Sequence, residues 1–153
     1  MLPFARLTII GLGLIGSSVA RAVRAQMPAM RITGHDADPI VRERAVALGL
    51  CDDVTDTAGA SVMDADLVIL CVPVGAMGAV AAEFAADLPV DAVVSDVGSC
   101  KQSVAEALGA VLPNAIIIPA HPVAGTEKSG PDAGFSTLFK GRWCILTPPD
   151  NAP

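Results

Sequence analysis

The sequence predicts an α/β fold of the doubly wound type, in which helices cover both faces of a mostly parallel sheet. Short runs rich in β-branched residues alternate with alanine-rich segments of helical period along the chain, and this alternation is typical of βαβ units. The runs are apolar without polar alternation, as expected for a parallel sheet that is buried on both faces. A chain of 153 residues is long enough for one such domain.

The order of these segments gives the expected elements. Strands are predicted at residues 6–10, 31–34, 67–72, 92–96, 115–119 and 142–146. Helices are predicted between them, at residues 14–25, 39–48, 75–86 and 101–111.

The segment 121–139 differs from the rest of the chain. It is rich in Gly, Pro, Ser and Thr without a sustained apolar period, which indicates a long loop or a set of turns. Loops of this length inside a compact domain usually carry a function, so a site is expected here. The proline-containing tail 148–153 is expected to be a linker or a truncation point, which leaves 1–147 as the domain.

Composition excludes several classes of function. The net charge of -6 argues against nucleic acid, whose binding depends on clustered Lys and Arg. No apolar stretch reaches the roughly 18 residues of a membrane span, and Arg6 interrupts the apolar start of the chain, which does not resemble a signal peptide. A cytoplasmic protein is therefore expected.

The four cysteines are scattered singly, without the close spacing of a metal or redox motif. No metal site is predicted, and reduced thiols are expected. Cys100 is interpreted as a small buried residue.

A glycine motif follows the first predicted strand. The turn reads Gly11-Leu12-Gly13-Leu14-Ile15-Gly16 and opens a helix. In a dinucleotide-binding Rossmann domain the first glycine permits the tight turn, the second lets the backbone approach the pyrophosphate, and the third lets helix and strand pack closely. The amides of the first helical turn, which includes Leu14 and Ile15, would then face the phosphates.

An acidic residue stands where the adenosine ribose would lie. Asp36 comes 20 residues after Gly16, at the end of the second predicted strand, where a carboxylate binds the ribose hydroxyls of NAD and repels the 2′-phosphate of NADP. NAD is therefore the expected cofactor. The alternative is that Asp36 caps the next helix, although Asp38, directly before Pro39, is the better cap. His35 is expected at the surface or beside the ribose.

Two further residues are candidates for the cofactor site. Val72 and Pro73 follow an apolar run, at the carboxyl edge where ligands bind in such sheets. Both are expected to line the adenosine side, and a purely structural strand end is the alternative.

Three sequence blocks together resemble the prephenate and arogenate dehydrogenase family. They read Gly11-Leu12-Gly13-Leu14-Ile15-Gly16-Ser17-Ser18, Asp96-Val97-Gly98-Ser99-Cys100-Lys101 and His121-Pro122-Val123-Ala124-Gly125-Thr126-Glu127-Lys128-Ser129-Gly130. The first block occurs in many dehydrogenases, whereas the third, about twenty residues after a Gly-Ser-x-Lys block, is distinctive. The resemblance extends over essentially the whole chain.

The resemblance implies an NAD-dependent oxidative decarboxylation, of prephenate to 4-hydroxyphenylpyruvate or of arogenate to tyrosine. It implies that His121 is the catalytic histidine and Ser99 its orienting partner, while Thr126 and Glu127 line the substrate pocket. A neutral imidazole suits the task of accepting the ring hydroxyl's proton near pH 7. The structural alternatives are a hydrogen-bonded packing histidine and, for Ser99 and Lys101, residues that begin a helix.

Members of this family continue into a helical domain that dimerises and completes the substrate site. The chain stops before such a domain, so it is expected to be the cofactor-binding half of a homodimeric enzyme for a small-molecule substrate, with little activity by itself. The sequence does not choose between prephenate and arogenate. Two other functions stay open: an NAD-binding regulatory module without catalysis, and the cofactor domain of a β-hydroxyacid dehydrogenase.

Overall fold

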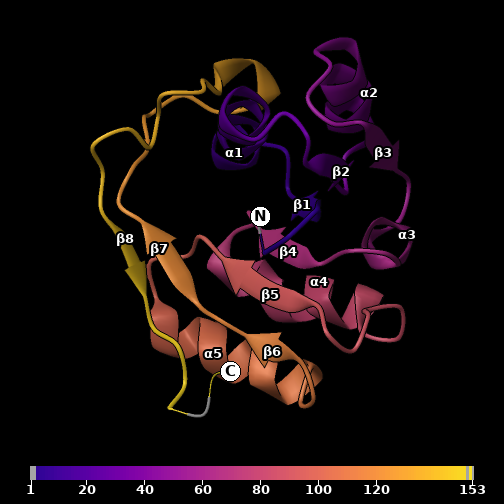
Figure 1. Cartoon of the computed structure of the whole chain (residues 1–153), viewed down its shortest axis with the longest axis vertical. Coiled ribbons are helices and arrows are strands. Elements are labelled where there is room, and N and C mark those ends of the chain that lie inside the picture. The colour runs from indigo at the N-terminus through magenta and orange to yellow at the C-terminus, as the bar shows by residue number, and fades with distance from the viewer. Residues whose placement is uncertain (1–2, 151, 153) are drawn as a thin grey trace.

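A six-stranded parallel sheet forms the centre of the molecule (Figure 1). The computed structural model describes residues 3–150 and 152. Along the sheet the strands lie in the order β3-β2-β1-β4-β5-β6, and every pairing between neighbours is parallel. Their bounds are β1 Arg6–Ile10, β2 Arg31–His35, β3 Asp53–Thr55, β4 Leu67–Leu70, β5 Val93–Asp96 and β6 Ile116–Ile117. The predicted fold class is confirmed.

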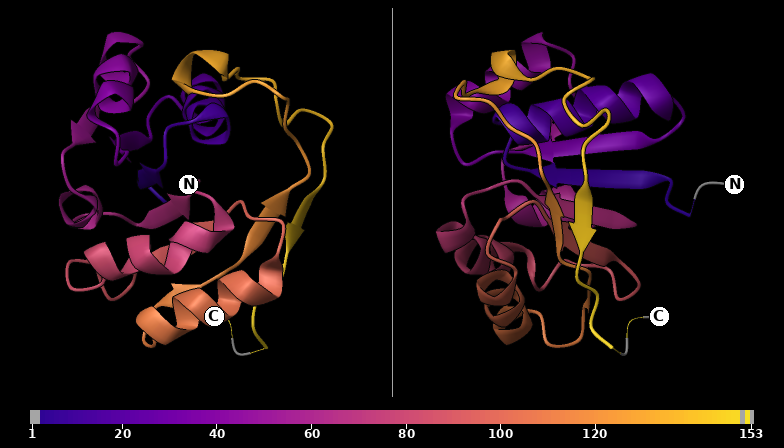
Figure 2. Two further views of the ribbon diagram at one scale, coloured as in Figure 1. Left: turned by 180° about the vertical axis from the view of Figure 1, so that it is seen from behind. Right: turned by 90° about the vertical axis from the view of Figure 1, so that its left-hand side faces the viewer.

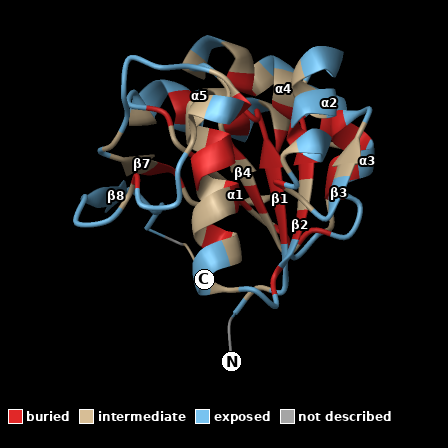
Figure 3. Ribbon diagram, turned by 90° about the horizontal axis from the view of Figure 1, so that it is seen from above, coloured by how far each residue is buried: buried red, intermediate tan, exposed pale blue. Residues whose placement is uncertain are grey.

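Helices cover the sheet on both faces, as the views in Figures 2 and 3 show. The helices are α1 Leu14–Gln26, α2 Pro39–Ala47, α3 Ala58–Val62, α4 Met77–Phe84 and α5 Lys101–Val111, with a 3₁₀ turn η1 Val74–Ala76 before α4. One buried cluster joins β1 and β2 to α1 and α2. A second joins β4 and β5 to α3, α4 and α5. Within β1, Ile9 belongs to the first cluster and Ile10 to the second, because successive strand residues point to opposite faces.

The four predicted helices and the first strands agree with the structure to within a few residues, but β3 and α3 were not expected. They have 3 and 5 residues respectively, too few to show a period in the sequence. The Thr57 side chain caps α3 by accepting a hydrogen bond from the amide of Ala60 at 3.2 Å. No helix in the described part of the chain reaches across a bilayer, since α1, with 13 residues, is the longest.

The end of the chain departs from the prediction in one respect. The strand expected at 142–146 exists as β8 Cys144–Leu146, but it pairs antiparallel with β7 Ala120–Pro122 in a separate two-stranded ribbon. The segment predicted as a loop from 121 therefore begins inside a strand. Ile118 still donates to the carbonyl of Val94 at 2.9 Å, and Pro119, which has no N–H, then ends the pairing with β5.

The chain between β7 and β8 crosses the outer side of α1 (Figure 2). We call residues 130–135, which include the 3₁₀ turn η2 Pro131–Ala133, the strap. The amide of Phe135 donates to Ser18 Oγ at 3.1 Å, and Arg21 donates to the carbonyl of Pro131 at 2.9 Å. Arg44 of α2 binds both carboxylate oxygens of Asp132, and this hydrogen bonding lowers the pKa of Asp132.

Gly16 permits the close approach between α1 and the turn that precedes it. A Cβ atom placed on Gly16 would lie 1.9 Å from the carbonyl oxygen of Gly11. At Gly13, three residues earlier, a Cβ would meet no atom within 4 Å. The two glycines therefore serve different purposes.

We expect the substitution Gly16→Ala to lower the free energy of unfolding by about 2–3 kcal/mol, because α1 must move away from the turn. Gly13→Ala is the matched control and should change the free energy of unfolding by less than about 0.5 kcal/mol. Urea denaturation of the two variants measures the difference. Equal stability of both would contradict the close approach.

We also expect the four thiols to react at two distinct rates. Burial raises the pKa of Cys51 and of Cys71 to about 12, with Asp52 and Asp96 respectively adding to the effect, whereas Cys100 and Cys144 are exposed. Because the thiolate is the nucleophile, Ellman's reagent at mildly alkaline pH should label only the exposed pair until urea unfolds the chain. A Cys100→Ser/Cys144→Ser variant that still reacts rapidly when folded would show this assignment to be wrong.

Candidate functional site

A cavity of about 360 Å³ opens at the carboxyl ends of β1, β2 and β4. Its wall brings together residues that lie far apart in the sequence: Gly11, Gly13, Asp36, Val72 and Pro73. This edge of a doubly wound sheet is where such folds bind their ligands. All five were expected at a cofactor site.

The glycine turn shapes one wall of the cavity. Gly11 has a φ of 94°, which a residue with a side chain rarely adopts, and its amide donates to the carbonyl of His35 at 2.8 Å. Gly13 is the N-cap of α1, and no side chain caps the helix there. Leu14 and Ile15 form the first turn beside the cavity, whereas Gly16 is buried behind it.

The Asp36 carboxylate is fixed against the glycine turn. One oxygen accepts from the amide of Leu12 at 2.8 Å and the other from the amide of Asp38 at 3.0 Å. Asp38, and not Asp36, caps α2 by accepting from the amide of Ile40 at 2.8 Å. The alternative interpretation of Asp36 as a helix cap therefore does not apply.

His35 lies in the wall of the cavity next to Asp36, which is the second of the two positions expected for it. It is only 5% exposed, and its ring Nδ1 donates to the carbonyl of Thr55 at 2.9 Å. The first position, at the surface, is wrong, because the unpredicted strand β3 covers this side of β2.

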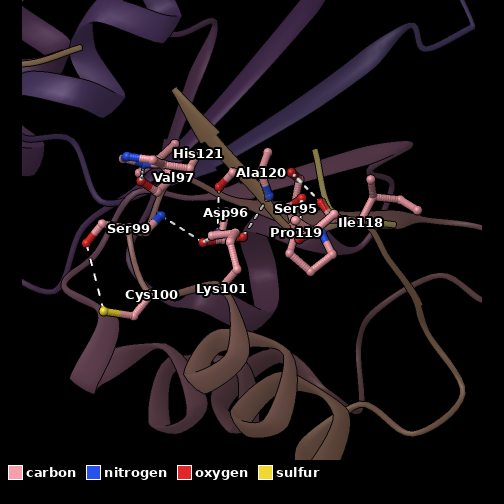
Figure 4. Close-up of polar contacts among 12 residues, drawn as sticks. Ser95, Asp96, Val97, Ser99, Cys100, Lys101, Ile118, Pro119, Ala120 and His121 are labelled. Carbon is pink, nitrogen blue, oxygen red and sulfur yellow. Dashed lines mark hydrogen bonds and ion pairs between the residues drawn. The ribbon is translucent and has the colours of Figure 1, made fainter. Parts of the chain in front are cut away.

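His121 lies in β7, beyond the end of β5 (Figure 4). Its Nδ1 lies 3.3 Å from the carbonyl oxygen of Val97, and a carbonyl can only accept a hydrogen bond. Nδ1 therefore carries the proton, and in the neutral ring Nε2 keeps its lone pair. The ring is partly buried, which leaves an edge that a ligand can reach.

Ser99 is exposed, and its hydroxyl points toward the sulfur of Cys100, 4.0 Å away (Figure 4). No direct hydrogen bond joins it to His121 among the described residues. Cys100 rather than Ser99 is the N-cap of α5 and makes no side-chain cap. Cys100 is exposed, which corrects the expectation of a buried residue: it stands at the exposed start of a helix.

A buried ion pair beneath His121 was not predicted. The Asp96 carboxylate binds the Lys101 ammonium and accepts from the amides of Gly98 at 2.7 Å and Ala120 at 3.1 Å. Lys101 also donates to the carbonyl of Ala120 at 2.6 Å. Asp96 is 1% exposed. An aspartate that ends an apolar strand needs a partner for its charge once it is buried. The position of Asp96 at the end of such a run could therefore have indicated the ion pair from the sequence.

Thr126 and Glu127 lie on the exposed loop that follows β7. The Thr126 hydroxyl accepts from the amide of Lys128 at 3.2 Å. No described contact brings these two side chains to His121. In the described residues, histidine, cysteine and acidic side chains do not gather in a group of three that could hold a metal ion.

Known proteins that are similar to this chain point to one family. Residues 19–153 match the family model "Prephenate dehydrogenase, nucleotide-binding domain". The chain is 52% identical over its whole length to a cyclohexadienyl dehydrogenase of Zymomonas mobilis, and 37% identical over 142 residues to a prephenate dehydrogenase of Bacillus subtilis.

Solved structures show the same likeness. Prephenate dehydrogenase of Aquifex aeolicus, in complex with hydroxyphenyl propionate and NAD+, superposes with a TM-score of 0.90 at 34% identity, covering 99% of this chain and 53% of that one. Synechocystis arogenate dehydrogenase superposes with a TM-score of 0.88 at 28% identity, covering 97% of this chain and 51% of that one.

The chain covers 52% of the Zymomonas mobilis protein and 38% of the Bacillus subtilis protein, so it spans about half the length of its relatives or less. Within that span, the glycine turn and the His121 segment occur in one domain, as the sequence blocks indicated. The chain belongs to the prephenate dehydrogenase family and corresponds to its nucleotide-binding domain.

Proposed function

We propose that this chain binds NAD and forms the cofactor-binding half of a prephenate or arogenate dehydrogenase. The main support is that the chain combines a glycine-lined cavity with His121. Nδ1 of this histidine donates to the carbonyl of Val97, which leaves Nε2 to accept a proton. A glycine cavity alone would suit many dehydrogenases. The histidine adds a group suited to accepting a proton at the reacting carbon's hydroxyl.

Several features of the cavity suit a dinucleotide. Gly13 leaves open space in which a pyrophosphate can approach the backbone, and the uncapped first turn of α1 offers N–H groups and a positive dipole end to it. The Asp36 carboxylate, already held by two amides, would accept hydrogen bonds from ribose hydroxyls. Val72 and Pro73 would contact the adenosine side.

Bound NAD would supply the hydride acceptor. In the proposed reaction the C–H electron pair leaves the ring carbon as hydride, and Nε2 of His121 accepts the hydrogen bond, and then the proton, of the hydroxyl on that carbon. The electron pair of the C–CO₂ bond restores the aromatic ring as CO₂ leaves, and the ring oxygen, now a phenolate, takes the proton back from His121. Ser99 would orient the substrate hydroxyl after a rotation of its side chain, and Thr126 and Glu127 would line the pocket.

The remaining parts of the proposal concern the whole protein. Because the relatives are about twice as long, we propose that a helical second domain completes the substrate site and forms a homodimer in the cytoplasm. Titration of the chain with NAD tests the first half of the proposal. Turnover of prephenate and arogenate by a protein of the relatives' length that contains this chain tests the second.

The wild-type chain should bind NAD more tightly than NADP, since Asp36 opposes a 2′-phosphate. We expect Asp36→Asn to narrow the ratio of the two dissociation constants by roughly 10-fold to 100-fold, while the amide oxygen still accepts from Leu12. Asp38→Asn is the matched control, because asparagine still caps α2 and the ratio should not change. Isothermal titration measures both constants. Equal or tighter binding of NADP by the wild type would overturn the assignment of Asp36.

In the longer protein, His121→Asn should lower kcat by roughly two to four orders of magnitude, the usual scale for losing a general base. The dissociation constant for NAD should stay nearly unchanged, because the ring does not line the glycine cavity. Steady-state kinetics together with NAD titration separates the two effects. A variant that keeps full turnover would exclude His121 as the base.

A further inference from the structure

We propose that Asp96 and Lys101 are positioning residues that hold His121 in the tautomer with the proton on Nδ1. The inference rests on the proposed function only in taking His121 as the base. It concerns how that histidine is prepared for the reaction: the ion pair fixes two peptide groups beside the ring, the one between Val97 and Gly98 and the one between Ala120 and His121.

The first peptide group, between Val97 and Gly98, contains the carbonyl that accepts a hydrogen bond from the ring. The Val97 carbonyl and the Gly98 N–H belong to one peptide group and point in opposite directions, because the peptide is planar and trans. Asp96 holds the Gly98 N–H at 2.7 Å, so the Val97 carbonyl is turned away from Asp96 and toward His121 Nδ1, at 3.3 Å. A Cβ on Gly98 would lie 2.8 Å from the Val74 side chain, and this crowding further restricts the turn.

The second peptide group, between Ala120 and His121, precedes the residue that bears the ring. The Ala120 carbonyl belongs to the peptide group that enters His121, and Lys101 Nζ binds it at 2.6 Å. The Ala120 amide, on the other side of the same residue, donates to Asp96 at 3.1 Å. The backbone before His121 is therefore fixed by both members of the ion pair, as Figure 4 shows.

Neither Asp96 nor Lys101 can fix these two peptide groups without the other. Asp96 is fully buried as a side chain and Lys101 is 16% exposed, so loss of the ammonium leaves a desolvated carboxylate with no counter-charge. A lysine suits the position because its tetrahedral ammonium has several donors and can bind a carboxylate and a carbonyl at once. A helix start alone would require neither contact to Ala120.

Nitrogen NMR of the ring tests the inference, because the chain has only 2 histidines. In a ¹⁵N-labelled chain, long-range ¹H–¹⁵N correlation above the histidine titration range reports which ring nitrogen is protonated, and His121→Asn assigns the signals. His35, whose Nδ1 donates to Thr55, is the internal reference. We expect the Nδ1–H tautomer for both rings in the wild type.

In Lys101→Met, the ratio of Nδ1–H to Nε2–H at His121 should fall by about 10-fold, the worth of one such hydrogen bond, while His35 stays unchanged. Lys140→Met, the same change at an exposed lysine, should alter neither ring. If Lys101→Met does not fold, Asp96→Asn/Lys101→Met, which leaves no unpaired charge, gives the same readout. In the longer protein, Lys101→Met should lower kcat by up to about 100-fold through misplacement of the base, with unchanged affinity for NAD.

Two results would overturn the inference: a wild-type His121 with its proton on Nε2, or a folded variant lacking the ion pair in which His121 keeps the Nδ1–H tautomer. Both are independent of turnover. Absence of dehydrogenase activity in the wild-type protein would instead contradict the proposed function.

Discussion

The buried contact between Asp96 and Lys101 is the constraint on which the end of the molecule that carries His121 depends. It joins the last residue of β5, the first residue of α5 and the first residue of β7. Breaking such a pair by removing one partner typically costs about 3–5 kcal/mol, a large part of a domain's stability. The sheet, the helix behind it and the segment with His121 are thus held at one point.

The other end of the site depends on steric contact rather than charge. Gly16 allows α1 to lie against the turn that Gly11 forms, and the amides of Leu12 and Asp38 hold the Asp36 carboxylate beside it. The cavity is lined by residues between 10 and 83, whereas His121 comes from the ribbon β7–β8. Strands β4 and β5 connect them, because Val97 at the end of β5 still donates to the carbonyl of Leu70 in β4 at 3.2 Å.

Much of this arrangement could be predicted from the sequence. The glycine motif and the alternation of strands and helices are local signals, and they gave the fold class and the residues round the cavity. The contact of Asp96 with Ala120 and the burial of His35 could not be predicted, because these residues bind partners 24 and 20 residues away. The ribbon β7–β8 was missed for the same reason: periodicity predicts that 142–146 is extended, but not which strand it pairs with.

The strap has a consequence for the order in which the chain can fold. Ser18 and Arg21 of α1 find their partners 117 and 110 residues later in the sequence. During synthesis, which proceeds from the N-terminus, α1 must therefore wait for most of the chain before its outer side is covered. The covered surface is polar, since Ser17, Ser18 and Arg21 form it. A chain that has not yet reached the strap thus exposes hydroxyl and guanidinium groups on this side of α1 rather than an apolar patch.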